Sequence, residues 1–223
     1  MKFIEYPDRD MLAINVANAI AGDLETHLLH HETASFAVAG GSTPAPIFDD
    51  LCAADVAWDR VHVMATDERW VPLEDTRSNA RMIKERLLTD RAAAARFLPF
   101  HVPARAPEEV LAEIEAQIVP ELPLSVLLLG MGEDMHTASL FPKVEGLTQA
   151  LSPNAPVLSV LRPDSQPEPR ISLTAPILDG ALAKHLVIYG TAKKDALNRA
   201  LSLPPEQAPI QAVLTEITVH WAP

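Results

Sequence analysis

The hydrophobic positions of this chain alternate between short apolar runs and longer stretches with helical spacing. The apolar runs predict strands at residues 35–39, 61–66, 124–129, 157–161, 170–173, 185–189 and 217–221. The stretches with helical spacing predict helices at residues 7–30, 44–53, 78–88, 108–119 and 192–203. Alternating strands and helices favour an α/β fold, a mostly parallel sheet with helices on both faces.

Proline-rich stretches at residues 163–169 and 204–209 predict loops. They are not predicted to be domain linkers, because no charged or Gly/Ser-rich tract accompanies them.

Four unusual polar segments follow directly after predicted strands. They are residues 40–44 (GGSTP), 67–69 (DER), 130–136 (GMGEDMH) and 190–193 (GTAK). The chain has eight glycines, and five of them lie in these segments. Glycine is favoured where a backbone turns sharply or approaches a ligand. Because open α/β sheets bind ligands at the carboxyl ends of their strands, these segments are candidates for one site.

The GGSTP segment has the composition of an anion-binding loop. Its two glycines allow backbone amides to point inward, and the hydroxyls of Ser42 and Thr43 add donors and suit helix N-caps. Pro44 suits the first turn of the following helix. An ordinary strand-to-helix turn explains the same residues, and both interpretations stay open. The spacing and the lysine of a Walker A loop are absent.

The charged residues of the other segments also allow two interpretations. The DER segment is either a solvated surface cluster or a place where an acid faces a pocket and Arg69 holds a substrate oxygen. Arg170 begins a predicted strand and Lys193 opens a predicted helix; singly, each is typical of a surface charge. Together they would supply local positive potential.

The segment after the strand at 124–129 carries the sharpest chemistry. Asp134 and His136 stand two residues apart on a glycine-rich turn, which makes them candidates for proton transfer. A dinucleotide-binding fingerprint is disfavoured, because Met135 occupies the place of its third glycine.

Composition and charge restrict the partners. The chain has 18 Lys and Arg against 30 Asp and Glu, a net charge of −12, which disfavours nucleic acid and anionic membranes. An anionic small substrate would need a local basic pocket.

The single cysteine, Cys52, excludes an intrachain disulfide. We find no apolar run of the ~18 residues that a membrane helix needs and no signal peptide, so the cytoplasm is expected. No metal-binding motif is present, and no metal or cofactor is expected.

The motifs together resemble the 6-phosphogluconolactonase family. The resemblance covers nearly the whole chain in order: GGSTP, DER with the following VP and SN, the segment GMGEDMHTASLFP at 130–142, RISLT at 170–174, and Gly190 with Lys193. The TASLFP portion favours the lactonases over the related glucosamine-6-phosphate deaminases. The resemblance implies one Rossmann-like α/β domain over residues 1–223. It also implies hydrolysis of 6-phospho-D-glucono-1,5-lactone to 6-phosphogluconate in the pentose phosphate pathway, without a metal.

The resemblance also implies catalytic roles. His136 would be the general base that activates water and later returns the proton to the leaving ring oxygen. Asp134 and Asp67 would shape the site, orient His136 or bind sugar hydroxyls. Arg69 would polarise the substrate or stabilise the developing oxyanion.

Substrate binding is implied for a second group of residues. The phosphate would lie against Gly41, Ser42 and Thr43, with Arg170 and Lys193 as counter-charges. The only partner expected is the small sugar-phosphate substrate, with no nucleic acid or membrane. The sequence does not fix the oligomeric state, and a monomer is favoured.

One departure from the family keeps alternatives open. Met135 stands where the family has glycine, and Lys143 where it often has glycine. If that glycine uses a positive φ, Met135 is strained and would re-aim His136; otherwise it would sit in an allowed conformation and narrow the pocket. The alternative functions are therefore a sugar-phosphate-binding protein with impaired catalysis and an aminosugar-phosphate deaminase or isomerase.

Overall fold

The main sheet of the protein is parallel throughout. The computed structural model describes residues 1–164 and 166–223. Within this part, seven strands hydrogen-bond side by side, and every pair is parallel. In spatial order they are β1 (Lys2–Glu5), β10 (Thr218–Ala222), β9 (Ala183–Tyr189), β6 (Val126–Gly130), β2 (Ala34–Val38), β3 (Val61–Ala65) and β5 (Arg96–Leu98).

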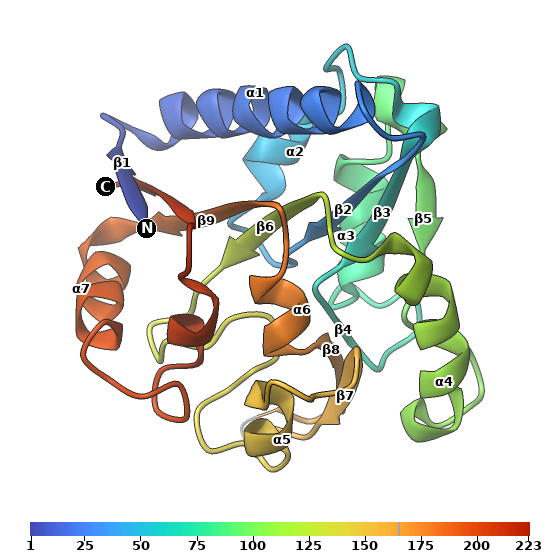
Figure 1. The fold of residues 1–223 in the computed structure, drawn as a ribbon, viewed down its shortest axis with the longest axis vertical. Coiled ribbons are helices and arrows are strands. Elements are labelled where there is room, and N and C mark those ends of the chain that lie inside the picture. The colour runs from blue at the N-terminus through green and yellow to red at the C-terminus, as the bar shows by residue number, and fades with distance from the viewer. Residues whose placement is uncertain (165) are drawn as a thin grey trace.

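Helices cover both faces of this sheet, because the apolar side chains of each strand alternate between two cores. In β2, Phe36 and Val38 belong to one core and Ala37 to the other. The first core is closed by α1 (Arg9–Leu28), α2 (Ala45–Leu51) and α3 (Asn79–Arg86). The second is closed by α4 (Pro107–Ile118), α5 (Leu147–Leu151), α6 (Ala175–Asp179) and α7 (Gly190–Ala200). Figure 1 shows α1 and α2 on one side of the sheet and α6 and α7 on the other. The predicted α/β fold class is confirmed.

A second, smaller sheet was not predicted. It is antiparallel, in the order β4 (Asp67–Arg69), β8 (Arg170–Leu173) and β7 (Leu158–Leu161). The last two were expected as strands of the mostly parallel sheet, and β4 was expected as a polar segment. A bend at Thr66 separates β3 from β4, and in β4 the carboxylates of Asp67 and Glu68 find buried hydrogen-bond partners.

The remaining differences from the predicted elements concern short segments. β1, β5, α5 and α6 contain five residues or fewer and were not predicted. Such lengths are too short to display a clear period. The proline-rich loop predicted at 163–169 includes Ser165, which lies outside the described residues. None of the described helices is both long and apolar enough to span a membrane.

The arrangement of the sheet brings the four polar segments together. The strands that precede them are β9, β6, β2 and β3, which are consecutive neighbours in the sheet. Because these strands are parallel, their carboxyl ends lie at one edge, and the chain segments that follow them meet there.

A chain of hydrogen bonds runs from Tyr6 to Asp23 through two histidines, His220 and His185, which are buried within the sheet. Tyr6 Oη is 2.9 Å from His220 Nδ1, His220 Nε2 is 3.0 Å from His185 Nδ1, and His185 Nε2 is 2.8 Å from Asp23 Oδ2. If each group donates to the next, from Tyr6 to Asp23, both histidines are neutral and every nitrogen is satisfied. Burial, followed by the nearby His185, lowers the pKa of His220 to about 3.

This lowered pKa predicts a loss of stability at acidic pH. The unfolded chain takes up a proton on residue 220 near its ordinary pKa of 6.5, whereas the folded protein does so only near 3. The unfolded state therefore binds more protons in that window. As the pH is lowered, this group decreases the free energy of unfolding by up to about 1.4 kcal/mol per pH unit. Urea unfolding of the wild type and of His220→Gln should show this extra slope only in the wild type. The control His30→Gln, at an exposed histidine, should keep it; equal slopes in the wild type and His220→Gln would refute the assignment.

Candidate active site

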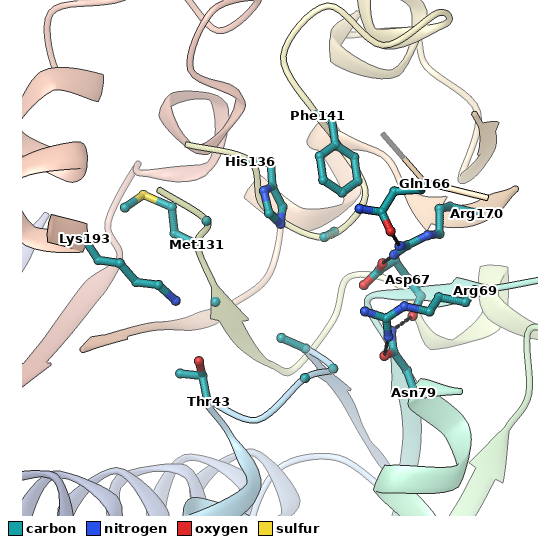
Figure 2. A pocket seen from close by; sticks show the side chains of 16 residues that line it. Thr43, Asp67, Arg69, Asn79, Met131, His136, Phe141, Gln166, Arg170 and Lys193 are labelled. Carbon is teal, nitrogen blue, oxygen red and sulfur yellow. Dashed lines mark hydrogen bonds and ion pairs between the residues drawn. The ribbon is translucent and has the colours of Figure 1, made fainter. Parts of the chain in front are cut away.

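A cavity of about 260 Å³ opens at the carboxyl edge of the main sheet. Among the sequence-predicted site residues, those that line it are Gly41, Thr43, Asp67, Arg69, His136, Arg170 and Lys193. Figure 2 shows His136 projecting into the cavity, with Lys193 on one side and Arg69 and Arg170 on the opposite side. The structure thus brings together side chains from all four strand ends.

His136 is held by a carboxylate on the side away from the cavity. Asp134 Oδ1 lies 2.5 Å from His136 Nδ1 and also accepts a hydrogen bond from the His136 backbone N–H at 3.2 Å. The hydrogen bond with the imidazole is the main cause of the lowered pKa of Asp134. A carboxylate on Nδ1 places the proton on that nitrogen and leaves the Nε2 lone pair for a ligand. Asp134 is exposed and does not line the cavity itself.

The turn between β6 and His136 is built around a glycine. A Cβ atom on Gly132 would lie 2.3 Å from two atoms of the His136 ring and 2.5 Å from Asp134 Oδ1. The Gly132 N–H donates to the carbonyl of His136, and its carbonyl accepts from the N–H of Met135, each at 3.0 Å. Only glycine at position 132 leaves room for the acid and the imidazole to face one another.

Met135 adopts a left-handed backbone conformation, with φ of +68°. Lys143, at the second position noted in the family resemblance as often glycine, has φ of +66°. The hypothesis of a positive φ is therefore correct. The Met135 side chain packs against the apolar core and is not among the residues that line the cavity, so it does not narrow the pocket. Its carbonyl accepts a hydrogen bond from the N–H of Ile210, and His136 keeps its contact with Asp134.

Asp67 is a buried acid, not part of a solvated cluster. Its side chain is 8% exposed, accepts hydrogen bonds from Thr66 Oγ1 at 3.2 Å and Ser139 Oγ at 2.5 Å, and lies 3.8 Å from Arg170 Nη1. Hydroxyl donors and a nearby cation offset the free-energy cost of burying this carboxylate.

Arg170 is an almost fully buried cation at the cavity wall. Its side chain is 4% exposed, and Nη2 donates to Gln166 Oε1 at 2.8 Å. Within the described part of the chain, Nε has no hydrogen-bond partner. Burial lowers the pKa of the guanidinium, which nevertheless stays charged at neutral pH. A buried cation whose donors are only partly satisfied favours an anion in the cavity.

Arg69 and Lys193 supply the other two cations. Arg69 Nη1 donates to the carbonyl of Arg77 and to Asn79 Oδ1, both at 2.8 Å. Lys193 follows β9 in the first turn of α7, and burial lowers its pKa, partly offset by Glu133. The three cations create local positive potential in a protein whose net charge is −12.

The first loop differs from its prediction in two respects. Gly41 has φ of +84° and lines the cavity with Thr43, but Ser42 is exposed and does not line it. Neither hydroxyl caps the next helix: α2 begins after Pro44, and no side chain caps it. Proline fixes the backbone of this turn, so a side-chain cap is not needed to start the helix.

Nine further described residues line the cavity but were not assigned a role from the sequence, and the side chains of three of them, Asn79, Phe141 and Gln166, contact other residues of the site. Asn79 and Phe141 lie within motifs that carried the family resemblance, so the motifs themselves pointed to them. The Phe141 ring stacks on His136, with centroids 4.2 Å apart. Gln166 lies in the proline-rich loop, where no sequence pattern distinguishes it. Among the described residues, no group of three or more His, Cys, Asp or Glu is placed to hold a metal ion.

An α/β sheet whose strand ends carry a histidine–aspartate pair and three cations defines a protein that handles an anionic small molecule. Comparisons with known proteins make this specific. The family model for glucosamine-6-phosphate isomerases/6-phosphogluconolactonase matches residues 7–221. The chain belongs to this family.

The relatives are similar over nearly their whole length. The 6-phosphogluconolactonase of Mesorhizobium japonicum is 40% identical, over 98% of this chain and 94% of its own. That of Pseudomonas aeruginosa is 38% identical, over 95% of this chain and 90% of its own. A crystal structure of a 6-phosphogluconolactonase from Shewanella baltica superposes with a TM-score of 0.95 at 30% identity, covering 100% of this chain and 98% of that one.

The left-handed conformation of Met135 leads to a prediction about stability. Met135→Gly removes a conformational cost of about 1–2 kcal/mol but also loses side-chain packing and frees the unfolded chain, so the net change should stay within about 1 kcal/mol. Met135→Val, with a β-branched side chain in the same region, should be clearly less stable than both. Urea unfolding measures this difference, and NMR of the His136 Nδ1 proton should show the bond to Asp134 intact in Met135→Gly. Loss of that signal would mean that the methionine itself holds the histidine in place.

Proposed function

We infer that the protein hydrolyses 6-phospho-D-glucono-1,5-lactone to 6-phosphogluconate, the lactonase step of the oxidative pentose phosphate pathway. The relatives from M. japonicum and P. aeruginosa are 6-phosphogluconolactonases, at 40% and 38% identity. The observation that carries the inference is the His136–Asp134 pair, whose imidazole Nε2 has no hydrogen-bond partner among the described residues and lies beside a cavity rich in cations. The cytoplasmic location and the monomeric state stay predictions.

The chemistry needs one base and one place for negative charge. His136 Nε2 accepts a proton from water as the water oxygen bonds to the lactone carbonyl carbon. The carbon–ring oxygen bond then breaks, and the imidazolium returns the proton to the ring oxygen, which leaves as the C5 hydroxyl of the product. Asp134 stabilises the imidazolium between these two proton transfers. The carboxylic acid of the product ionises to the carboxylate and releases a proton to solvent.

We assign the three cations two roles, binding of the phosphate and stabilisation of negative charge at the carbonyl. We place the phosphate against Gly41 and Thr43, with Lys193 and Arg170 as counter-charges. Ser42 is left out of this contact set, because its side chain does not line the cavity. Arg69 is the cation that polarises the carbonyl and stabilises its developing negative charge. Because lactones of this kind also hydrolyse without a catalyst, positioning and proton transfer together account for the acceleration.

The deciding experiment compares lactone hydrolysis by the wild type with the spontaneous reaction. The wild type should accelerate it, and His136→Ala, which lacks the base, should lower kcat by about a hundredfold or more. Because the variant is prepared in the same way, its loss of activity also excludes a contaminating lactonase. A folded wild type without acceleration would disprove the function, and full activity in His136→Ala would disprove the base. Ammonia release from glucosamine-6-phosphate would instead indicate a deaminase.

A second experiment tests the phosphate contact of Arg170. Arg170→Ala removes a charged donor worth about 1.5–3 kcal/mol, so KM should rise about tenfold or more while kcat changes little. Arg91→Ala is the matched control, because Arg91 is paired with Asp55 on the exposed surface and does not line the cavity. The unfolding midpoints should be compared first, since Arg170 is buried beside Asp67. An unchanged KM in folded Arg170→Ala would remove this residue from the phosphate site.

A further inference from the structure

We propose that Asn79 is a positioning residue, which sets the place of Arg69 relative to the first loop, and that Gly40 is a glycine because Asn79 occupies the space beside it. The proposal deepens the proposed function, on which it rests for the role of Arg69. It concerns Gly40, which follows β2, Arg69 at the end of β4, and Asn79 in the first turn of α3.

The side-chain amide of Asn79 is fixed at both ends. Asn79 is 3% exposed; its Nδ2 donates to the carbonyl of Asp67 at 2.7 Å, and its Oδ1 accepts from Arg69 Nη1 at 2.8 Å. These partners determine which end of the amide is which, because a carbonyl can only accept and a guanidinium can only donate. The amide therefore joins the backbone of β4 to the cation at its end.

Arg69 depends on this contact for its orientation. Its two side-chain hydrogen bonds, to the Arg77 carbonyl and to Asn79 Oδ1, both leave from Nη1. In the part of the chain that the structure describes, the other N–H groups of the guanidinium make no hydrogen bond, and they remain for a ligand. Figure 2 shows Arg69 and Asn79 joined in this way at the edge of the cavity.

A buried acid holds the backbone of Asn79. Glu68 is 1% exposed, and its Oε1 accepts from the N–H groups of Arg69 and Asn79, both at 2.8 Å. Its Oε2 accepts from the Ala80 N–H at 2.7 Å and from Ser78 Oγ at 3.1 Å. Burial raises the pKa of Glu68 and the three backbone N–H groups oppose this; four donors around one side chain favour the carboxylate. Glu68 thus ties the first turn of α3 to β4.

Gly40 packs directly against the Asn79 amide. A Cβ atom on Gly40 would lie 2.0 Å from Asn79 Oδ1, 2.2 Å from Cγ and 2.6 Å from Nδ2. Gly40 is not among the glycines with positive φ, so its backbone does not itself demand glycine. An alanine at position 40 would have to displace the amide, and with it the hydrogen bond that orients Arg69. The two glycines that begin the loop are therefore needed for different reasons. Gly40 leaves space for the Asn79 amide, and Gly41 has φ of +84°.

The proposal is tested by two double-mutant cycles in kcat/KM for the lactone. Asn79→Ala should lower kcat/KM about tenfold, and Gly40→Ala by a similar factor. The double variant Gly40→Ala/Asn79→Ala should lie within about twofold of Asn79→Ala, because the methyl group then enters the vacated space. In the Arg69→Ala background, Asn79→Ala should lower kcat/KM by less than about twofold. A general loss of structure would not produce this coupling. Additive effects in either cycle would overturn the proposal.

Two further measurements keep the test decisive. Gly22→Ala is the matched control for Gly40→Ala, because a Cβ atom on Gly22 meets nothing within 4 Å, and it should leave kcat/KM unchanged. Asn79→Ser replaces Asn79→Ala in both cycles if the alanine variant does not fold. If the wild type does not hydrolyse the lactone, the proposed function fails on its own. Both cycles are then measured from the Kd of 6-phosphogluconate, whose carboxylate takes the place of the lactone carbonyl beside Arg69; coupling supports the positioning role of Asn79 and additivity overturns it.

Discussion

The parallel pairing of β9, β6, β2 and β3 is the constraint on which the rest of the site depends. Each strand packs apolar side chains on both faces, and the polar residues of the site lie at the end where the chain leaves the sheet. Parallel strands leave at the same edge, and four adjacent strands therefore deliver the glycine loop, the acid and arginine of β4, the histidine turn and the lysine of α7 to one cavity. The apolar strands determine where the polar residues meet.

Burial of charge at this edge follows from the same arrangement. Asp67, Glu68 and Arg170 are each at most 6% exposed, and an isolated ion at such a position would be very unfavourable. The two carboxylates are satisfied by hydroxyl and backbone donors, whereas the Nε of Arg170 has no partner within the described residues. The hydrogen bonds of the two acids are thus satisfied, whereas those of the neighbouring cation are not. The cavity therefore keeps a positive potential, although the whole protein is acidic.

Much of this arrangement could be predicted from the sequence, and the failures have physical causes. The long apolar periods located the main helices and strands, and glycine clustering located the strand ends. The antiparallel strand at Asp67 was missed because a polar segment is expected at the surface, and only three-dimensional contacts reveal its buried partners. Gln166 could not be found, because its place depends on how a proline-rich loop lies over Arg170. Ser42 was expected beside the phosphate but does not line the cavity, because a loop sequence does not reveal which of two neighbouring hydroxyls faces inward.

The glycines of the site distinguish two requirements that look identical in a sequence. At Gly40 and Gly132 the space for a Cβ atom is filled by a side chain of the site, so any other residue must displace Asn79 or the His136–Asp134 pair. At position 135 the backbone has a positive φ, which glycine adopts readily and an L-residue adopts at a cost of about 1–2 kcal/mol. A protein can absorb that cost through stability elsewhere, but it cannot place two atoms in one space. Methionine is therefore accepted at position 135 with the histidine turn intact, whereas Gly132, three residues earlier, is fixed by the geometry of the site itself.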